Sequence, residues 1–224
     1  MRYTILILAF ISNISFVSGQ DFIYPVIKSK AKTITEFIPA EWNVVDTVNG
    51  DLNKDTFKDI AFVIENRNNK YLKPEEFQHF ILVIAFFDSI QNQFKLIEQC
   101  NNLILYNQYQ TSAWYEGMMI VNGILEISFF KGGITDNLTN YKFRYKENDF
   151  YLIGADRNIY NQVTKNFQNY SFNFLSKKWS VSTGNDESDS APKTEWRKLE
   201  NVTLMKLKDY KGPYTWEVSK GIYL

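Results

Sequence analysis

The chain has 224 residues, of which 45% are hydrophobic and 17% aromatic, and its formal net charge at pH 7 is zero. Because the sequence contains no stripe of basic residues, its composition argues against nucleic acid as a partner. A single cysteine, Cys100, excludes an internal disulfide. We therefore expect the fold to be stabilised by its own hydrophobic core.

Residues 1–19 have the pattern of a cleavable signal peptide. Arg2 precedes an apolar run over residues 5–17, and the small residues Ser18 and Gly19 follow it. A membrane anchor is the competing interpretation, but the run falls short of the roughly 20 apolar residues of a spanning helix and polar residues interrupt it. We expect an exported protein, periplasmic or secreted, with no membrane span after cleavage.

Residues 20–224 are enough for a single β-rich domain. Residues 60–64 alternate in hydrophobicity as a strand does, and residues 80–87 form a continuous apolar run, typical of a strand buried on both faces. Residues 94–97 are expected to return antiparallel to that run. The only helical pieces we expect are short, such as residues 74–79 after a polar loop at residues 66–71.

Three hairpins are predicted in the second half of the chain. Asn122 and Gly123 separate two apolar segments, and this pair accepts the positive φ angles of a type I′ turn. This first hairpin joins residues 118–121 to residues 124–130. The other two are predicted from polar turns between apolar runs, and they join residues 141–145 to 150–153 and residues 170–174 to 179–181.

The segment that follows the third hairpin is different. Residues 183–192 are small and acidic, end at a proline and show no apolar period, which predicts a flexible loop. Residues 195–207 are expected to supply one more strand and a tail. Successive strands joined by short turns predict a mainly β antiparallel meander with little helix, closing as a sandwich, a barrel or propeller-like blades.

A calcium loop is the most specific pattern in the chain. Asp51, Asn53, Asp55 and Asp59 occupy positions 1, 3, 5 and 9 of a D-x-N-x-D-x-x-x-D pattern, and Ca²⁺ prefers such oxygen ligands. An EF-hand would place a glutamate at position 12 and a helix on each side. Phe62 stands at that position, in a segment that alternates as a strand, so the EF-hand interpretation fails.

Residues 50–65, GDLNKDTFKDIAFVIE, resemble the FG-GAP or VCBS-type repeat, in which a D-x-[DN]-x-D-G-x-x-D loop enters a strand. The later segments YKFRYKENDFYLIGAD and FNFLSKKWSV look like parts of uncharacterised exported bacterial proteins with one such loop. The resemblance implies a structural Ca²⁺ held by the side chains named above and by the backbone carbonyl of Phe57.

Thr56 departs from the family pattern. The family has glycine at this place, where the chain turns with positive φ, and a β-branched residue is strained there. The competing interpretation is a loop without metal, in which Asp51, Asn53 and Asp55 accept hydrogen bonds from nearby backbone amides. Both interpretations remain open at this point, and in both the loop has a structural role.

Catalytic chemistry finds few candidates in the sequence. His79 is the only histidine, and at the start of a buried strand it is more typical of a structural residue than of a base. No signature joins it to Cys100, and one of each cannot supply a zinc site. A hydrolase of envelope polysaccharide needs only two carboxylates, for which Glu116, Glu126 and Glu147 are candidates.

We expect a non-enzymatic exported protein that binds a partner at the envelope, with the calcium loop as a structural element. A glycan is one possible partner, stacked on aromatic side chains such as Trp114, Tyr115 and Trp179. A protein that docks on a strand edge is the other. The aromatic residues are equally typical of a β core, which is the interpretation their number favours.

Overall fold

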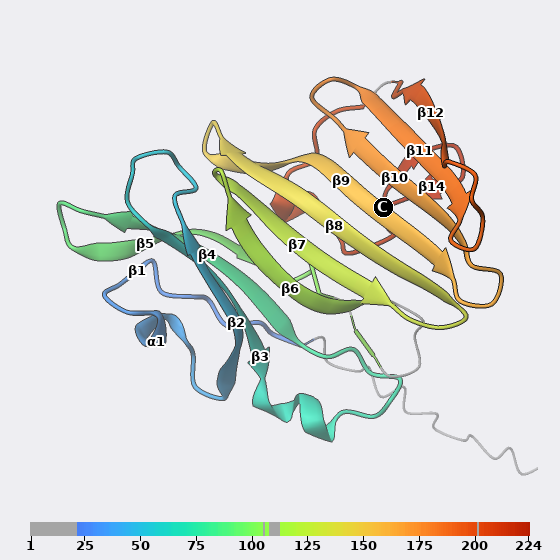
Figure 1. The fold of residues 1–224 in the computed structure, drawn as a ribbon. Helices are drawn as coiled ribbons and strands as arrows, with labels where there is room; N and C mark the ends of the chain where they lie inside the picture. The colour runs from blue at the N-terminus through green and yellow to red at the C-terminus, as the bar shows by residue number, and fades with distance from the viewer. Residues whose placement is uncertain (1–21, 105, 108–112, 201) are drawn as a thin grey trace, which may run out of the picture.

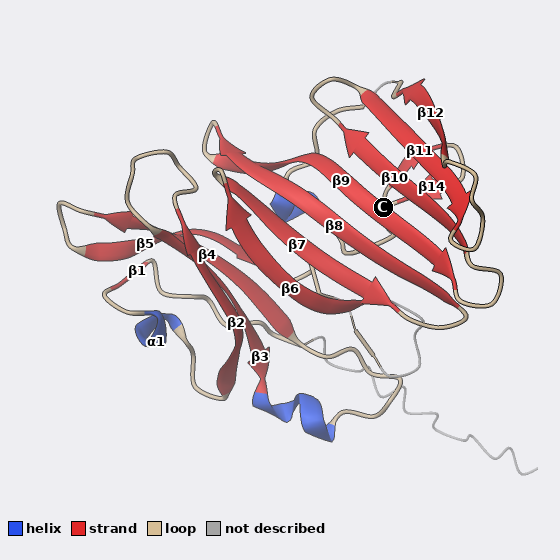
Figure 2. Ribbon diagram, viewed as in Figure 1, coloured by secondary structure: helices blue, strands red, loops and turns tan. Residues whose placement is uncertain are grey.

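The computed structural model describes residues 22–104, 106–107, 113–200 and 202–224. The predicted signal peptide therefore lies outside the described residues, as does its cleavage point. Strands and connecting loops make up almost all of the fold (Figure 2). The elements are, in chain order, β1 Lys30–Ala31, α1 Ile34–Phe37, β2 Trp42–Gly50, β3 Asp59–Asn66, the 3-10 helix η1 Arg67–Tyr71, β4 Phe80–Asp88, β5 Gln93–Cys100, β6 Trp114–Val121, β7 Ile124–Lys131, β8 Thr135–Lys146, β9 Asp149–Asn161, β10 Asn166–Asn173, β11 Lys178–Asn185, β12 Lys193–Lys198, the 3-10 helix η2 Leu207–Asp209, β13 Glu217–Ser219 and β14 Ile222–Tyr223.

Two antiparallel sheets build the molecule (Figure 1). The first has the strand order β1-β5-β4-β3-β2 and the second the order β12-β11-β10-β9-β8-β7-β6, with β13 and β14 forming a separate two-stranded ribbon. Almost every neighbour in a sheet is also the next strand in the chain. The predicted mainly β antiparallel meander is thus confirmed, and the two facing sheets correspond to the sandwich among the three closures considered.

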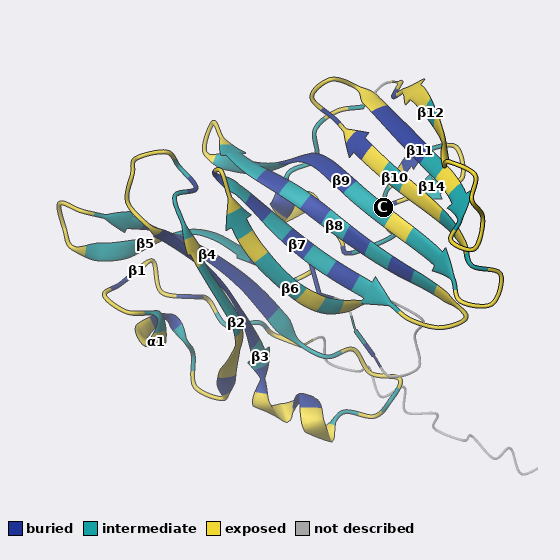
Figure 3. Ribbon diagram, viewed as in Figure 1, coloured by how far each residue is buried: buried dark blue, intermediate teal, exposed yellow. Residues whose placement is uncertain are grey.

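The central strands of the five-stranded sheet are buried on both faces, as Figure 3 shows. Ala61 and Val63 of β3 face the second sheet, whereas Ile60 and Phe62 pack beneath the N-terminal segment that carries Phe37. Burial on both sides explains why β4 has no alternation in its sequence, because neither of its faces meets water.

The seven-stranded sheet has one face that is buried and one that is more open to solvent, and the alternation is regular along β7 and β8. The five-stranded sheet covers part of the buried face. The C-terminal segment covers the rest, since Leu207, Tyr210 and Leu224 belong to the same core cluster as Phe172 and Trp179. In Figure 1 this segment runs behind β8 to β11.

One acidic side chain connects the edges of the two sheets. Asp46 lies at an irregularity of β2, and opposite it β6 has a second irregularity between Tyr115 and Gly117. The Oδ2 atom of Asp46 accepts hydrogen bonds from the Tyr115 hydroxyl at 2.6 Å and from the backbone N–H of Met118 at 3.2 Å. The two bulges therefore bring a carboxylate of one sheet to the edge of the other.

The three predicted hairpins are confirmed, as β6–β7, β8–β9 and β10–β11. Asn122 and Gly123 have φ values of 53° and 73°, as a type I′ turn requires. Glu147 and Asn148 also have positive φ values, 51° and 65°, and join strands that extend well beyond the predicted segments.

The helix predicted at residues 74–79 is wrong. The segment holds only a turn, closed by a hydrogen bond from Glu76 N to the Lys73 carbonyl, before it becomes extended. The side chain of Asn69 explains the extended part, because it bonds both the N–H and the carbonyl of His79, at 2.8 and 3.1 Å. The helical turns lie instead at α1 and η1, where the sequence predicted none and a polar loop, respectively.

The loop predicted at residues 183–192 begins later than expected, because residues 183–185 belong to β11. Gly184 lies beneath the ring of Phe167, and a Cβ atom there would stand 2.5 Å from the Phe167 Cζ atom. Its small size therefore reflects contact with an aromatic ring on the neighbouring strand. The strand predicted at residues 195–207 exists as β12, which begins earlier and ends at Lys198. Among the described residues, no helix is long and apolar enough to cross a membrane.

Candidate functional site

The predicted calcium loop connects β2 to β3 and is a network of side-chain to backbone hydrogen bonds. Asp51 accepts bonds from the N–H groups of Lys54, Asp55 and Thr56, at 2.6, 3.1 and 2.9 Å. Asn53 accepts one from Asp55 N–H, and Asp55 accepts one from the N–H of Phe57. Both Asp51 oxygens are thus used by the backbone of the loop.

Thr56 adopts the conformation that the family pattern implies for its position. Its φ is 76°, in the left-handed region that glycine adopts without strain. Lys54 also has a positive φ, 68°. The hydrogen bonds to Asp51 hold this backbone in place, and the loop folds as a tight turn around that carboxylate.

Asp59 is buried at the base of the loop and serves three backbone donors. Its Oδ2 accepts from Leu52 N–H at 2.8 Å and from Asn53 N–H at 3.3 Å, and its Oδ1 accepts from Phe87 N–H at 3.1 Å. Burial raises the pKa of this carboxyl to about 6 despite those bonds. Asp59 therefore connects the loop to β4.

The oxygens of the loop as arranged fit the metal-free interpretation more directly than a calcium site. Every carboxylate oxygen of Asp51, Asp55 and Asp59 accepts a hydrogen bond from the protein. Within the part of the chain that the structure describes, no group of three His, Cys, Asp or Glu side chains is placed to hold a metal ion. Calcium binding by the loop stays a prediction.

His79 and Cys100 do not form a catalytic dyad. The imidazole of His79 stacks on Phe22, with ring centroids 3.5 Å apart, and burial lowers its pKa. Cys100 is buried, its Sγ lies 3.8 Å from the Leu207 carbonyl, and burial raises its pKa to about 11. A thiol held in its neutral form is a poor nucleophile.

The three candidate carboxylates for glycoside hydrolysis stay on separate elements. Glu116 lies on β6 and accepts a hydrogen bond from the Trp114 indole at 3.2 Å. Glu126 lies on β7, and Glu147 lies in the turn after β8, where it pairs with Lys146. None of them lines the Trp216 cleft described below or the cleft beside Trp196.

The aromatic residues predicted as stacking platforms have three different environments. Trp114 is 44% exposed beside Phe130, which leaves part of its indole accessible. Tyr115 is half-buried, and its hydroxyl is bonded to Asp46. Trp179 is only 2% exposed, so its prediction as a platform is wrong. It lies on the inner face of β11 and is buried because the C-terminal segment covers that face.

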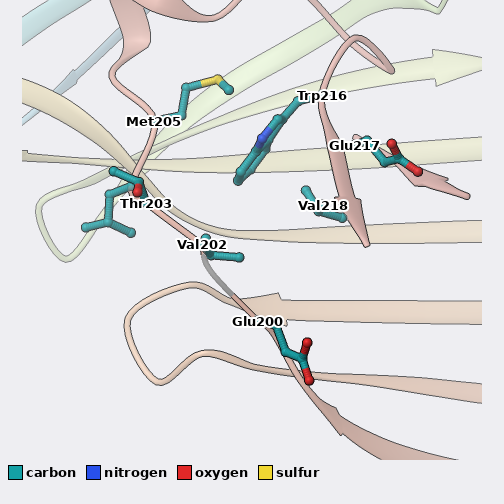
Figure 4. A pocket seen from close by; sticks show the side chains of 8 residues that line it. Glu200, Val202, Thr203, Met205, Trp216, Glu217 and Val218 are labelled. Atoms are coloured by element: carbon teal, nitrogen blue, oxygen red, sulfur yellow. The ribbon is translucent and has the colours of Figure 1, made fainter. Parts of the chain in front are cut away.

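A cleft near the C-terminal segment is the better candidate for a ligand site, and the sequence did not predict it. It has a volume of about 380 Å³ and is lined by five apolar residues and three polar ones. Figure 4 shows the side chains around it. The lining residues are Val202, Leu204, Met205, Trp216, Val218, Glu200, Thr203 and Glu217. Its size lies within the range of small-ligand sites, and it combines an aromatic ring with several polar groups.

Trp216 is the central residue of this cleft. Its ring packs on Phe174 with centroids 5.1 Å apart, and its backbone pairs with Leu224 through two hydrogen bonds of 3.0 and 2.9 Å. Among the described residues, neither its indole N–H nor the Thr203 hydroxyl has a hydrogen-bond partner. A rigid aromatic ring, a free donor and a free hydroxyl thus line one hollow.

The two carboxylates stand at the edges of the cleft. Figure 4 shows the Trp216 indole in the middle of the group, whereas Glu200 and Glu217 do not point toward one another. Both are exposed, and Glu217 accepts a hydrogen bond from the N–H of Gly221. They place hydrogen-bond acceptors at the rim. Neither glutamate belongs to a recognisable motif, so the sequence alone gave no indication that the two carboxylates line one cleft.

Comparison of the chain with protein-family models, with curated proteins and with solved structures finds no match.

Proposed function

We propose that the protein is an exported, non-enzymatic binding protein and that it binds a glycan in the Trp216 cleft. The observation that carries the proposal is the pairing of an accessible indole with unpaired polar groups in a hollow of about 380 Å³. Sugars present an apolar C–H face and a rim of hydroxyls. An indole suits the first, and carboxylate, hydroxyl and N–H groups suit the second.

Rigid support of the ring favours binding. Trp216 is fixed from behind by Phe174 and along its backbone by Leu224, so little side-chain entropy is lost when a ligand stacks on it. The carboxylates at the rim add hydrogen-bond acceptors that discriminate among hydroxyl patterns. Because these carboxylates are exposed to solvent, we expect the ligand to make several hydrogen bonds with the rim at once.

Hydrolysis of envelope polysaccharide by a carboxylate pair is the second candidate, because Glu200 and Glu217 line one cleft. A glycosidase needs two carboxyl groups on either side of the scissile bond, one of them an acid kept protonated in a dry pocket. Glu200 and Glu217 are exposed and do not face each other, which favours binding over hydrolysis.

A glycan array with the mature chain tests the proposal. We expect wild type to bind neutral glycans on the array, Trp216→Ala to lose that signal, and Trp114→Ala, which removes an indole outside the cleft, to keep it. Because Trp216 also packs on Phe174, Thr203→Val serves as a second variant that leaves the ring in place and should weaken binding. A blank array would refute the proposal and favour a protein partner. Binding of neutral glycans that survives both cleft variants would refute the cleft as the site and place the glycan elsewhere on the protein.

Release of reducing sugar ends decides between binding and hydrolysis. Cell-wall polysaccharide incubated with wild type should release none. Release that disappears in Glu200→Gln or Glu217→Gln would establish the hydrolase instead. Export is tested separately by fractionating cells that express the full chain. A mature protein that begins at Gln20 outside the cytoplasm supports it, and an uncleaved cytoplasmic chain contradicts it.

A further inference from the structure

A patch of unpaired lysines surrounds an exposed tryptophan on the outer face of β11 and β12. Lys178 lies directly opposite Lys198 in the antiparallel register, and Ser180 lies opposite Trp196, one step along the same face. Lys177 precedes Lys178 in the adjoining turn. We call these four residues, Lys177, Lys178, Trp196 and Lys198, the Trp196 patch.

The lysines of the patch lack the partners that neighbouring cations have. On the opposite face of β12, Lys193 and Arg197 both pair with Glu195, at 3.0 and 2.9 Å. Among the described residues, no ion pair includes Lys177, Lys178 or Lys198. Like charges directly opposite each other on a sheet are destabilising, so the Lys178–Lys198 pair weakens the free protein.

Trp196 is the most exposed tryptophan of the described residues, at 72%. Its indole contacts no other ring and makes no hydrogen bond within the described chain. A cleft of about 280 Å³ lies beside it, lined by Lys178, Trp196, Arg197 and Lys198. A large apolar ring left accessible between cations is typical of a recognition site.

We propose that the Trp196 patch binds an acidic polysaccharide. The carboxylates of a uronic-acid chain would pair with the ammonium groups of Lys178 and Lys198, and a sugar ring would stack on the indole. An anion placed between the two lysines would also remove their mutual repulsion. The charge of the patch therefore selects the anionic members among the sugars that an indole can hold.

The surroundings of the ring favour a polysaccharide over a membrane surface. Hydroxyl groups lie next to Trp196 along the same face, where Ser182 and Thr194 pair across the two strands and their side chains bond each other at 2.8 Å. These groups suit sugar hydroxyls, whereas a bilayer would need apolar neighbours around the ring. The acidic residues of the segment 186–192 lie at the opposite end of the β11–β12 hairpin.

The patch is separate from the Trp216 cleft, with which it shares no lining residue. The carboxylate adjacent to Trp196 in the chain, Glu195, is paired with Lys193 and Arg197 on the opposite face of β12, and Glu200 lines the Trp216 cleft. The proposal therefore does not depend on ligand binding in the cleft, and the two can fail independently.

Affinity electrophoresis of the mature chain in gels with polygalacturonate, a carboxylated polysaccharide, tests the proposal, and neutral dextran is the reference. We expect wild type to be retarded by polygalacturonate only, with retardation that weakens as salt rises. The double variant Lys178→Gln/Lys198→Gln should lose about tenfold in affinity or more. Lys28→Gln/Lys32→Gln removes the same charge from exposed sites elsewhere and should bind as wild type does.

Trp196→Ala should also weaken retardation, and Trp216→Ala should leave it unchanged, which separates this site from the cleft. Equal retardation by dextran and polygalacturonate, or equal losses in the two lysine double variants, would overturn the proposal. Binding to phosphatidylglycerol vesicles without binding to polygalacturonate would overturn it in favour of a membrane surface.

Discussion

The hydrogen bond between Asp46 and Tyr115 gives the sharpest prediction for stability, because it connects the two sheets at their edges. Replacing Asp46 with alanine removes a charged acceptor from the Tyr115 hydroxyl, 2.6 Å away, and from the Met118 N–H, 3.2 Å away. A hydrogen bond to a charged group contributes about 1.5–3 kcal/mol and an ordinary one about 1 kcal/mol. We expect Asp46→Ala to lower the free energy of unfolding by about 3 kcal/mol.

A double-mutant cycle measured by urea denaturation isolates the contact from other effects of each change. Tyr115→Phe keeps the ring and removes the hydroxyl, and we expect a coupling energy with Asp46→Ala of about 1.5 kcal/mol or more. Tyr145→Phe is the matched control, because its hydroxyl bonds neutral Asn148 at 3.3 Å on the surface. Its effect should stay below about 0.5 kcal/mol. A coupling energy near zero between Asp46 and Tyr115 would refute the structural reasoning.

Four further predictions concern the loop and the Trp196 patch. Burial gives Asp59 a folded-state pKa of about 6, above the ordinary 3.8, so the folded state binds its proton more tightly. The free energy of unfolding should thus fall as pH rises from about 4 to about 6, by at most about 3 kcal/mol and by less where solvent screens the loop. Urea denaturation at several pH values measures this change, and Asp59→Asn should lack the part of the pH dependence that Asp59 causes. Thr56→Gly should raise the free energy of unfolding by about 1 kcal/mol, because φ is 76° at Thr56, and a loss in the same assay would contradict the strain. Calcium should raise the melting temperature of wild type and a chelator should lower it, with neither effect in Asp51→Ala, and no shift in wild type would eliminate the ion. Lys198→Glu turns the repulsive pair with Lys178 into an attractive one and should stabilise the protein by about 0.2–1 kcal/mol, measured by thermal unfolding, whereas a destabilised variant would show that the pair is not repulsive.

The hairpins illustrate what could be predicted locally. The positive φ angles at Asn122 and Gly123 depend on two adjacent residues, and the apolar segments beside them have the strand period, so no distant contact was needed. The helix predicted at residues 74–79 failed for the opposite reason. The amide of Asn69, ten residues away from His79, holds the backbone of that residue extended, and short-range propensity cannot anticipate such a bond.

The loop was only half predictable from its residues. The pattern located the acidic side chains and the positive φ at Thr56 correctly. The direction in which each oxygen points depends on the packing around it, and three backbone N–H groups, one of them on β4, meet the Asp59 carboxylate. Contact with a neighbouring strand makes that carboxylate a structural acceptor.

The candidate sites depended on tertiary structure almost entirely. Trp179 and Trp196 both lie on the β11–β12 hairpin and are equally aromatic in the sequence, yet one is 2% and the other 72% exposed. The difference arises because the C-terminal segment covers the inner face of β11, and no periodicity reveals which face is covered. The Trp216 cleft likewise needs residues 200, 202–205 and 216–218 to lie side by side.

The sequence by itself determined the β meander and the position of a tight acidic loop. It did so through local properties: the D-x-N-x-D pattern, the Asn-Gly turn and the period of the strands. The closure into two packed sheets, the burial of Asp59 and the exposure of Trp196 were decided only by tertiary structure. The physical reason is that burial and hydrogen-bond partners come from residues distant in the chain, such as Asp46 and Tyr115, which only folding brings together.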